Sequence, residues 1–288
     1  MNTTSVLTVV ALSSVIVLGS DNVGARTMSS AGPTATLFVS GMASGSGSTI
    51  GPAGDLYVTE SATGRVLRVD PKTGNVSTFA SGLPTRIVGT GGAMDIAFIG
   101  GTAYVLITLV GPDVGGNDVV GIYRIDGPGS FTVIADIGEF AMAHPPSTPF
   151  FVPTGLAVSG NTIYVSEAGP VPHLPQNGKV VSFGPKSSVA TDVAAGARLL
   201  VDVEFGRGRT LFAISQGVWD GVAEGSPALP NTGALVEVNG NGTFTVVTDG
   251  LNQPTSLEVI GNTAYIVTLG GEIWKIEGIA GPPYGVAP

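Results

Sequence analysis

One phrase recurs along the chain, and its clearest copy is the segment 154–167, TGLAVSGNTIYVSE. Two short apolar runs, Leu156–Val158 and Ile163–Val165, flank a central Ser-Gly-Asn-Thr turn in this copy. Because Gly and Asn tolerate positive φ, the pattern predicts a tight β-hairpin. Its second half recurs at 54–60, and fuller copies lie at 95–105, 202–213 and 256–267.

Each copy carries an aromatic residue in its second apolar run, and these aromatics recur at intervals of roughly 50 residues, the period of a propeller blade. They are Tyr57, Tyr104, Tyr164, Phe212 and Tyr265. Each copy is followed by two more strand patterns, except the last copy, which is followed by one. In chain order these patterns lie at 65–69 and 76–80, 121–125 and 131–135, 179–183 and 188–193, 234–238 and 243–247, and 272–276. Repeats of four strands at this period predict an all-β fold, a β-propeller with four-stranded antiparallel blades.

The two ends of the repeat series complement each other. The fifth repeat lacks its fourth strand, and the strand pattern at 36–41 has no partner before it. Pairing these segments would close the ring and remove two exposed sheet edges. We therefore expect five blades, with the N-terminal strand completing the last; six blades are the alternative, if a long loop contains strands that the pattern does not reveal.

Composition agrees with this fold and narrows the classes of function. Charged residues make up only 11% of the chain, whereas it contains 44 Gly and 20 Pro, as expected for short strands joined by turns. The absence of Cys excludes disulfides, thiolate metal sites and cysteine nucleophiles. A net charge of −9 argues against nucleic acid and anionic membranes as partners.

The N-terminal residues have the pattern of an export signal. An apolar stretch at 6–18 precedes the small residues Val23, Gly24 and Ala25. We expect a signal peptide at 1–25, a flexible segment at 26–35, a propeller at 36–278 and a tail at 279–288. The expected protein is a monomer, secreted or periplasmic, and not bound to a membrane once the signal is cleaved; an uncleaved anchor is the alternative.

The long connections all fall on one rim of the predicted ring, which we call the top face. They contain His144, His173 and Trp219. Long loops on one rim are common places for functional sites, so these residues are candidates for binding a small molecule, a glycan or a protein. The alternative is that the Pro-rich loops only pack over the rim.

Aligning the copies also brings acidic residues to the mouth of the central channel. Thr49, Asp95, Gly155, Asp202 and Ser256 form one column of the innermost strands, and Gly51, Ala97, Ala157, Glu204 and Glu258 form the next on the same face. Glu60 and Glu167 end the second strands of their blades. Such oxygens could hold a divalent cation such as calcium, with Asp95 and Asp202 as ligands, or could act as a general acid and base. The alternative is that they bond backbone N–H groups where blades meet.

Several phrases together resemble the ScyD/ScyE family. They are 135–140 (ADIGEF), 152–158 (VPTGLAV), 161–167 (NTIYVSE), 200–205 (LVDVEF) and 233–238 (GALVEV). The resemblance covers roughly Thr36 to Gly278 and implies an exported β-propeller, without established catalytic residues. Single phrases are also similar to NHL-type propellers.

A second, more distant resemblance is to gluconolactonase-like propellers, which hold a divalent metal with a Glu, two Asn and an Asp. The matching columns here contain Asp95 and Asp202 but no Asn. Two hypotheses follow: a non-catalytic binding or scaffolding protein that uses the top face, or a metal-dependent hydrolase or lactonase.

Overall fold

The computed structural model describes residues 32–138, 153–169, 173–174, 176–184, 190–219, 221 and 226–279, all within one unit, Ala31–Pro288. The predicted signal at 1–25 and His144 lie outside these residues. Most of the predicted flexible segment and of the tail lie outside them too. No helix among the described residues has the length and apolar character needed to cross a membrane.

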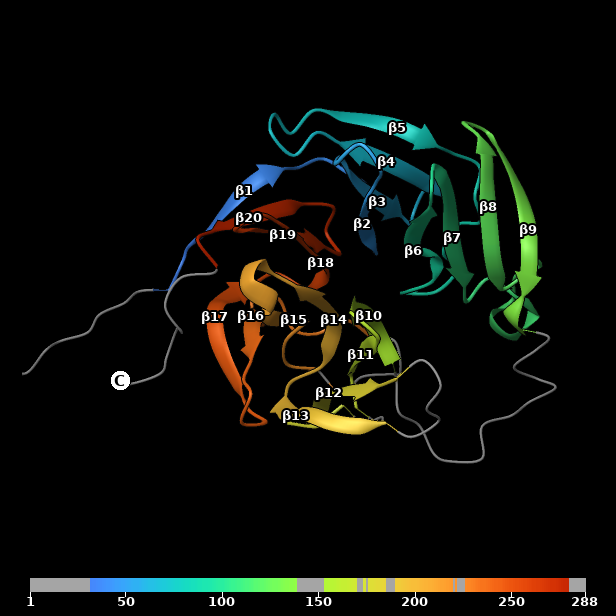
Figure 1. Ribbon diagram of the computed structural model, residues 1–288. Helices are drawn as coiled ribbons and strands as arrows, with labels where there is room; N and C mark the ends of the chain where they lie inside the picture. Colours follow the sequence, from blue (N-terminus) through green and yellow to red (C-terminus); the bar gives the residue numbers. More distant parts are fainter. Residues whose placement is uncertain are drawn as a thin grey trace, which may run out of the picture. The chain divides into compact units, whose positions relative to one another are not determined.

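Five four-stranded antiparallel sheets make up the described part of this unit, which confirms the predicted five-bladed β-propeller (Figure 1). The first blade contains β2 (Ser48–Ile50), β3 (Leu56–Glu60), β4 (Arg65–Val69) and β5 (Val76–Ala80). The second contains β6 (Gly92–Ile99), β7 (Thr102–Thr108), β8 (Gly121–Gly127) and β9 (Ser130–Asp136), with a short 3-10 helix, η1 (Pro112–Val114), between β7 and β8.

The remaining blades repeat the same order of strands. The third contains β10 (Pro153–Ser159), β11 (Thr162–Glu167), β12 (Gly178–Phe183) and β13 (Thr191–Ala197). The fourth contains β14 (Leu200–Phe205), β15 (Leu211–Ser215), β16 (Gly233–Val238) and β17 (Phe244–Leu251), with η2 (Arg207–Arg209) between its first two strands. The fifth contains β18 (Pro254–Ile260), β19 (Thr263–Thr268), β20 (Ile273–Glu277) and β1 (Ala35–Val39).

The N-terminal strand completes the fifth blade, as predicted. β1 lies antiparallel to β20, with Thr36 opposite Lys275 and Leu37 opposite Trp274. The Lys275 ammonium lies 3.5 Å from the centre of the Phe38 ring, which also contacts the Tyr265 ring edge to face at 5.8 Å. A cation–π contact and an aromatic pair therefore strengthen the seam in addition to its ladder of hydrogen bonds.

The recurring phrase forms the inner hairpin of each blade. In the third blade, Ser159 pairs with Thr162 across a two-residue turn, and Gly160 takes a φ of 59° that suits glycine. The alternation of apolar residues then sends one set of side chains toward each neighbouring blade. Packing between blades forms the core, whose buried clusters combine residues of adjacent sheets.

The register corrects one detail of the sequence alignment. Tyr57 pairs with Thr49, just as Tyr104 pairs with Ala97. Thr49 therefore belongs to the second column and Gly47 to the first, so the predicted positions of Thr49 and Gly51 are wrong by two residues. The segment before β2 is rich in Gly and Ser and has no apolar alternation that could fix its register.

Candidate functional site

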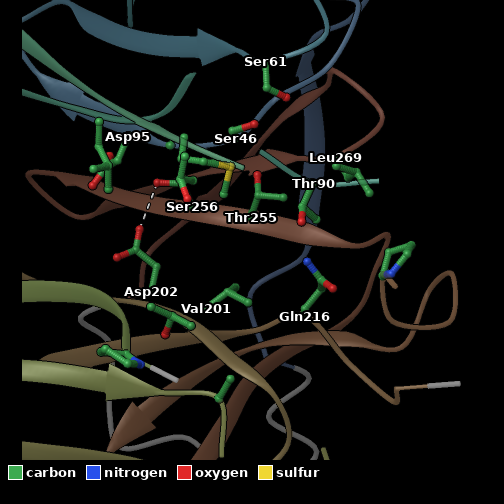
Figure 2. Close-up of a pocket in the computed structure, with 18 of the residues that line it drawn as sticks. Ser46, Ser61, Thr90, Asp95, Val201, Asp202, Gln216, Thr255, Ser256 and Leu269 are labelled. Atoms are coloured by element: carbon green, nitrogen blue, oxygen red, sulfur yellow. Dashed lines mark hydrogen bonds between the residues drawn. The ribbon is translucent and has the colours of Figure 1, made fainter. Parts of the chain in front are cut away.

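The innermost strands β2, β6, β10, β14 and β18 surround a cavity of about 530 Å³. Residues of all five blades line it, among them Ser46, Asp95, Thr154, Asp202 and Thr255 (Figure 2). It lies where the sequence predicted the channel mouth. A cavity of this size is in the range of small-molecule sites.

Glycine alternates with aspartate in the first column around the cavity: Gly47, Asp95, Gly155, Asp202 and Ser256 in successive blades. A Cβ atom at Gly47 would lie 2.4 Å from Asp95 Oδ1, and one at Gly155 would lie 2.3 Å from Asp202 Oδ1. Each glycine thus provides the space for the aspartate of the next blade. The column packs tightly because small and large residues alternate along it.

Asp202 joins the fourth blade to the fifth. Its Oδ2 atom accepts a hydrogen bond from Ser256 Oγ at 2.9 Å (Figure 2). The same atom accepts one from the Leu257 N–H at 2.9 Å, and Oδ1 accepts one from the Val203 N–H at 2.8 Å. Burial raises the pKa of Asp202 to about 6, although these hydrogen bonds favour the ionised form. Asp202 therefore holds a blade junction together, and its burial there raises its pKa above the ordinary value.

Asp95 occupies the same position in the second blade and has fewer partners. Its Oδ1 accepts one hydrogen bond, from the Ile96 N–H at 2.8 Å. Its place deep in the channel raises the pKa of Asp95 to about 7, and the charge of Asp202 adds to this rise. The Asp95 side chain is also exposed to the solvent that fills the cavity, and this solvent screens its charge.

Glu204 and Glu258 lie two residues further along β14 and β18, and neither lines the cavity. Burial raises the pKa of Glu204 to about 7, with a contribution from Asp202. Burial, followed by the charges of Glu204, Asp202 and Asp95, raises the pKa of Glu258 well above its ordinary value. We call Asp95, Asp202, Glu204 and Glu258 the acidic cluster; the structure brings them together as the columns predicted.

The acidic cluster does not fit a calcium ion. Among the described residues, no group of three or more His, Cys, Asp or Glu side chains is arranged to hold a metal. No Asn lines the cavity either. The donor set that the gluconolactonase resemblance would require is therefore not present in this part of the chain.

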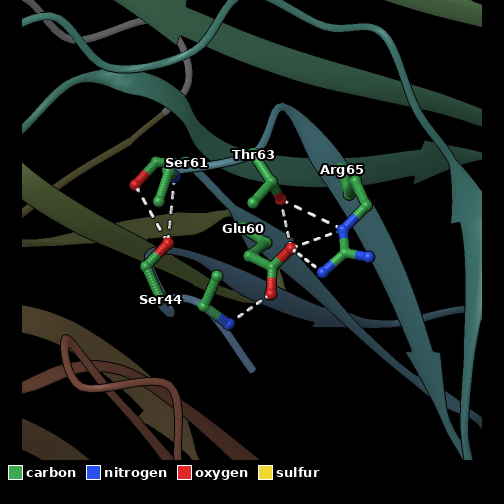
Figure 3. A network of polar contacts seen from close by, with 7 residues as sticks. Ser44, Glu60, Ser61, Thr63 and Arg65 are labelled. Atoms are coloured by element: carbon green, nitrogen blue, oxygen red, sulfur yellow. Dashed lines mark hydrogen bonds and ion pairs between the residues drawn. The ribbon is translucent and has the colours of Figure 1, made fainter. Parts of the chain in front are cut away.

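Glu60 has a structural position instead of a place at the channel mouth, which corrects the sequence prediction. It is fully buried, and its carboxylate pairs with Arg65, whose Nε lies 2.6 Å from Oε2, and accepts hydrogen bonds from Thr63 Oγ1 and the Ala43 N–H (Figure 3). Burial alone would raise the pKa of Glu60, but these hydrogen bonds and the Arg65 charge together lower it. Both carboxylate oxygens of Glu60 are therefore used in contacts within the first blade and the segment that leads into it.

Glu167 is not at the channel mouth either, which corrects a second part of the sequence prediction. Its Oε2 lies 3.5 Å from the ammonium of Lys179 on the neighbouring strand β12. The next residue, Ala168, lines the cavity, but Glu167 does not. The structure therefore does not bring Glu167 together with the acidic cluster.

His173 and Trp219 meet at the rim, although they come from loops of different blades. Their rings lie edge to face with centres 5.3 Å apart. His173 Nδ1 is 3.1 Å from the Gly169 carbonyl oxygen, and Trp219 Nε1–H donates to Ser226 Oγ at 2.9 Å. His173 and Ser226 both line the cavity, and Trp219 contacts both of them.

Most of the polar lining was not predicted, because it consists of hydroxyl groups. The lining contains Ser46, Ser61, Thr90, Thr108, Thr154, Ser226, Thr255 and Ser256, together with Gln216. A signal was present for two of them, since Pro-Thr precedes the column residue in both the third and fifth blades. Thr154 Oγ1 donates to the Leu200 carbonyl at 2.9 Å, and Thr255 Oγ1 to the Gly45 carbonyl at 3.2 Å, so both also bridge adjacent blades.

No model of a protein family matches the sequence, and no curated protein matches it either. Solved structures do match the fold. A luciferin-regenerating enzyme aligns with a TM-score of 0.54 at 11% identity, over 88% of this chain and 100% of that one. A gluconolactonase from Xanthomonas campestris aligns with a TM-score of 0.50 at 14% identity, over 84% of this chain and 89% of that one. At such identities the likeness shows the propeller fold alone.

Proposed function

We propose that this protein is an exported, ScyD/ScyE-like propeller that binds a small hydroxyl-bearing molecule, uncharged or cationic, in its central cavity. The observation that carries the proposal is the lining of the cavity: hydroxyl groups from all five blades and two aspartates, with no Lys or Arg among the described residues that line it. The proposed role is binding without chemical conversion. The sequence pattern of the first 25 residues supports the proposed export.

The hydroxyl groups favour a ligand that can both donate and accept hydrogen bonds. A Ser or Thr hydroxyl does both, so it suits a sugar or another polyol. Leu106, Leu199, Val201 and Leu269 supply apolar walls in the same cavity. A sugar-like ring, with apolar faces and polar edges, fits this combination.

The charge of the lining excludes another class of ligand. The carboxyl groups of Asp95 and Asp202 add negative charge to the cavity when they ionise, and no Lys or Arg among the described lining residues offsets it. Phosphate and carboxylate ligands would meet repulsion in such a cavity, while amines would be attracted.

The test is a binding screen with paired variants. Neutral sugars, sugar lactones and amines should raise the melting temperature, whereas the matching sugar phosphates should not. Thr108→Val removes a lining hydroxyl and should weaken binding by about tenfold, as expected for one lost hydrogen bond. Thr78→Val, on the exposed strand β5, is the matched control. Equal binding by the two variants, or binding of the phosphates alone, would contradict the proposal.

One observation favours a second candidate, a hydrolase or lactonase. Asp95 and Asp202 have pKa values raised to about 7 and about 6, and the charge of one raises the pKa of the other. Near neutral pH one carboxyl group can hold a proton while the other is ionised, as a general acid and base require.

Lactone and ester hydrolysis distinguishes the two candidates. Turnover that is abolished by Asp95→Asn, in a variant that still folds, would establish the enzyme and exclude pure binding. Because the donor set does not fit a metal, such turnover should persist with a chelator. Loss of activity on chelation, restored by calcium, would show that residues outside the described part complete a metal site.

A further inference from the structure

Four of the five blade junctions share one packing rule. The aromatic of the second strand packs against an apolar residue of the next blade's innermost strand. Tyr57 contacts Phe98 with ring centres 4.7 Å apart, and Tyr164 contacts Phe205 at 5.1 Å. Phe212 and Val259 share one core cluster, and Tyr265 and Ile50 share another.

The junction between the second and third blades does not follow this rule. By the register, Tyr104 should meet Val158 there. Val158 is instead 58% exposed, and Leu156 on the same face of β10 is 65% exposed. The equivalents of Leu156 in the fourth and fifth blades, Val203 and Leu257, are 0% and 1% exposed.

The facing side of the second blade is also apolar and uncovered. Ile99 is 72% exposed and Leu106 is 36% exposed. Both alternate with the residues that pack on the first blade, so they lie on the same face as Tyr104. Two complementary apolar faces of one chain are thus exposed at the same junction.

The polar contacts show the same difference. At two closed junctions, between the fourth and fifth blades and between the fifth and first, an inner-strand side chain accepts a hydrogen bond from the following blade: Asp202 from the Leu257 N–H and Ser256 Oγ from the Ser48 N–H. At the junction between the second and third blades, Asp95 and Leu156 stand in the corresponding positions, and both belong to the described part of the chain. The bond from the Leu156 N–H to Asp95 is not formed in this structure, where Asp95 accepts from Ile96.

Because the third blade has Gly155 in the column, its Leu156 N–H needs a hydrogen-bond acceptor from another blade. Where a blade has its own aspartate in the column, that aspartate accepts from the next N–H of its own strand, as in Asp202 with Val203. Gly155 has no side chain with which to do so, and its Cα is packed against Asp202. An acceptor for the Leu156 N–H must therefore come from the second blade, where Asp95 is placed for it.

We propose that the ring has a closed form in which the second and third blades dock like the others, with Tyr104 against Val158 and Asp95 accepting a hydrogen bond from the Leu156 N–H. The structure described above is then the open form. Met94, Asp95 and Leu106 line the cavity on one side of the seam, and Pro153 and Thr154 line it on the other, so closure narrows the cavity. This inference does not depend on the proposed function.

Cross-linking tests the docked pair directly, because the chain contains no native Cys. Tyr104→Cys combined with Val158→Cys should form a disulfide within one chain under mild oxidation. The control, Tyr104→Cys with Val246→Cys, joins the same position to a valine that is equally exposed on the outer strand β17 and should not form one. A disulfide between two chains would instead show that a second copy covers the face, and would overturn the proposal.

Single substitutions provide an independent test that needs no engineered bond. Val158→Ser should lower the melting temperature by several degrees more than Val246→Ser, because only Val158 is buried in the closed form. The Leu156 amide should exchange with solvent at least about tenfold faster in Asp95→Ala than in the parent, with the Leu257 amide unchanged. Equal melting temperatures for the two serine variants, or a Leu156 amide that exchanges freely in the parent, would rule out the closed form.

Discussion

Gly155 lies directly against Asp202, and a Cβ atom at residue 155 would come within 2.7 Å of the Asp202 Cα. Backbone cannot yield as a flexible side chain can. Gly155→Ala should therefore force the third and fourth blades apart and lower the free energy of unfolding by about 2 kcal/mol.

Gly101→Ala is the matched control, because a Cβ there meets no atom within 4 Å. Chemical denaturation of both variants measures the difference. A Gly155→Ala variant as stable as Gly101→Ala would show that the column is not tightly packed.

Glu60 should contribute far more to stability than an exposed carboxylate does. Glu60→Ala leaves the hydrogen-bonding groups of Ala43, Thr63 and Arg65 without their shared acceptor, and should cost about 3 kcal/mol. Asp126→Ala breaks an exposed pair with Arg124 and should cost less than about 1 kcal/mol. Urea titrations of the two variants decide the matter, and similar losses would contradict the structural role of Glu60.

The acidic cluster should make the protein less stable as pH rises. Folding raises the pKa values of Asp95, Asp202 and Glu204 to between about 6 and about 7, and raises that of Glu258 as well. The folded state then holds these protons more tightly than the unfolded state does. Their stabilising contribution is complete below about pH 4 and is lost as pH rises toward 7.

Glu258→Gln should reduce this loss, since it removes the charge that the other three members repel. We expect the free energy of unfolding of Glu258→Gln to exceed that of the parent by about 1 kcal/mol at pH 8, and by less at pH 5. Glu277→Gln, at an exposed position, is the control. Urea unfolding across this pH range measures the effect, and parallel profiles for the two variants would be evidence against a coupled cluster.

The seam between β1 and β20 should depend on Phe38. Phe38→Ala removes the contacts with Tyr265 and the Lys275 ammonium, and should cost about 2 kcal/mol. Leu37→Ala changes an exposed residue of the same strand and should cost well under 1 kcal/mol. Thermal unfolding measures the loss of stability of both variants. An equally small loss for Phe38→Ala would mean that the backbone hydrogen bonds alone hold β1 to β20.

The fold was largely predictable because the repeat phrase has the period of a blade. The N-terminal strand pattern, which has no partner near it in sequence, also matched the strand that the last repeat lacks. Strand boundaries followed from alternation, mostly within two or three residues; the fourth strand of the third blade begins at Thr191, three residues later than predicted. The first inner strand is only three residues long and follows a Gly/Ser segment, so its register was not readable.

The site was predictable only in part. The acidic cluster follows from columns that the repeat itself defines. Glu60 was misplaced because blade periodicity places a residue on its strand but does not show which partners its side chain takes; these are Thr63, in the turn that follows, and Arg65, the first residue of β4. Lining hydroxyl groups such as that of Thr108 were not predicted because Ser and Thr are common throughout this chain, and only the arrangement of the blades in space shows which of them line the cavity.

The closing seam also sets an order of events for synthesis. Thr36 Oγ1 donates to the Lys275 carbonyl across 239 residues of sequence, so the first strand to be made bonds to one of the last. Until the C-terminal strand emerges, both edges stay unpaired and able to join other growing chains. A truncated product lacking β20 would therefore be an aggregation hazard, whereas the completed chain can seal itself.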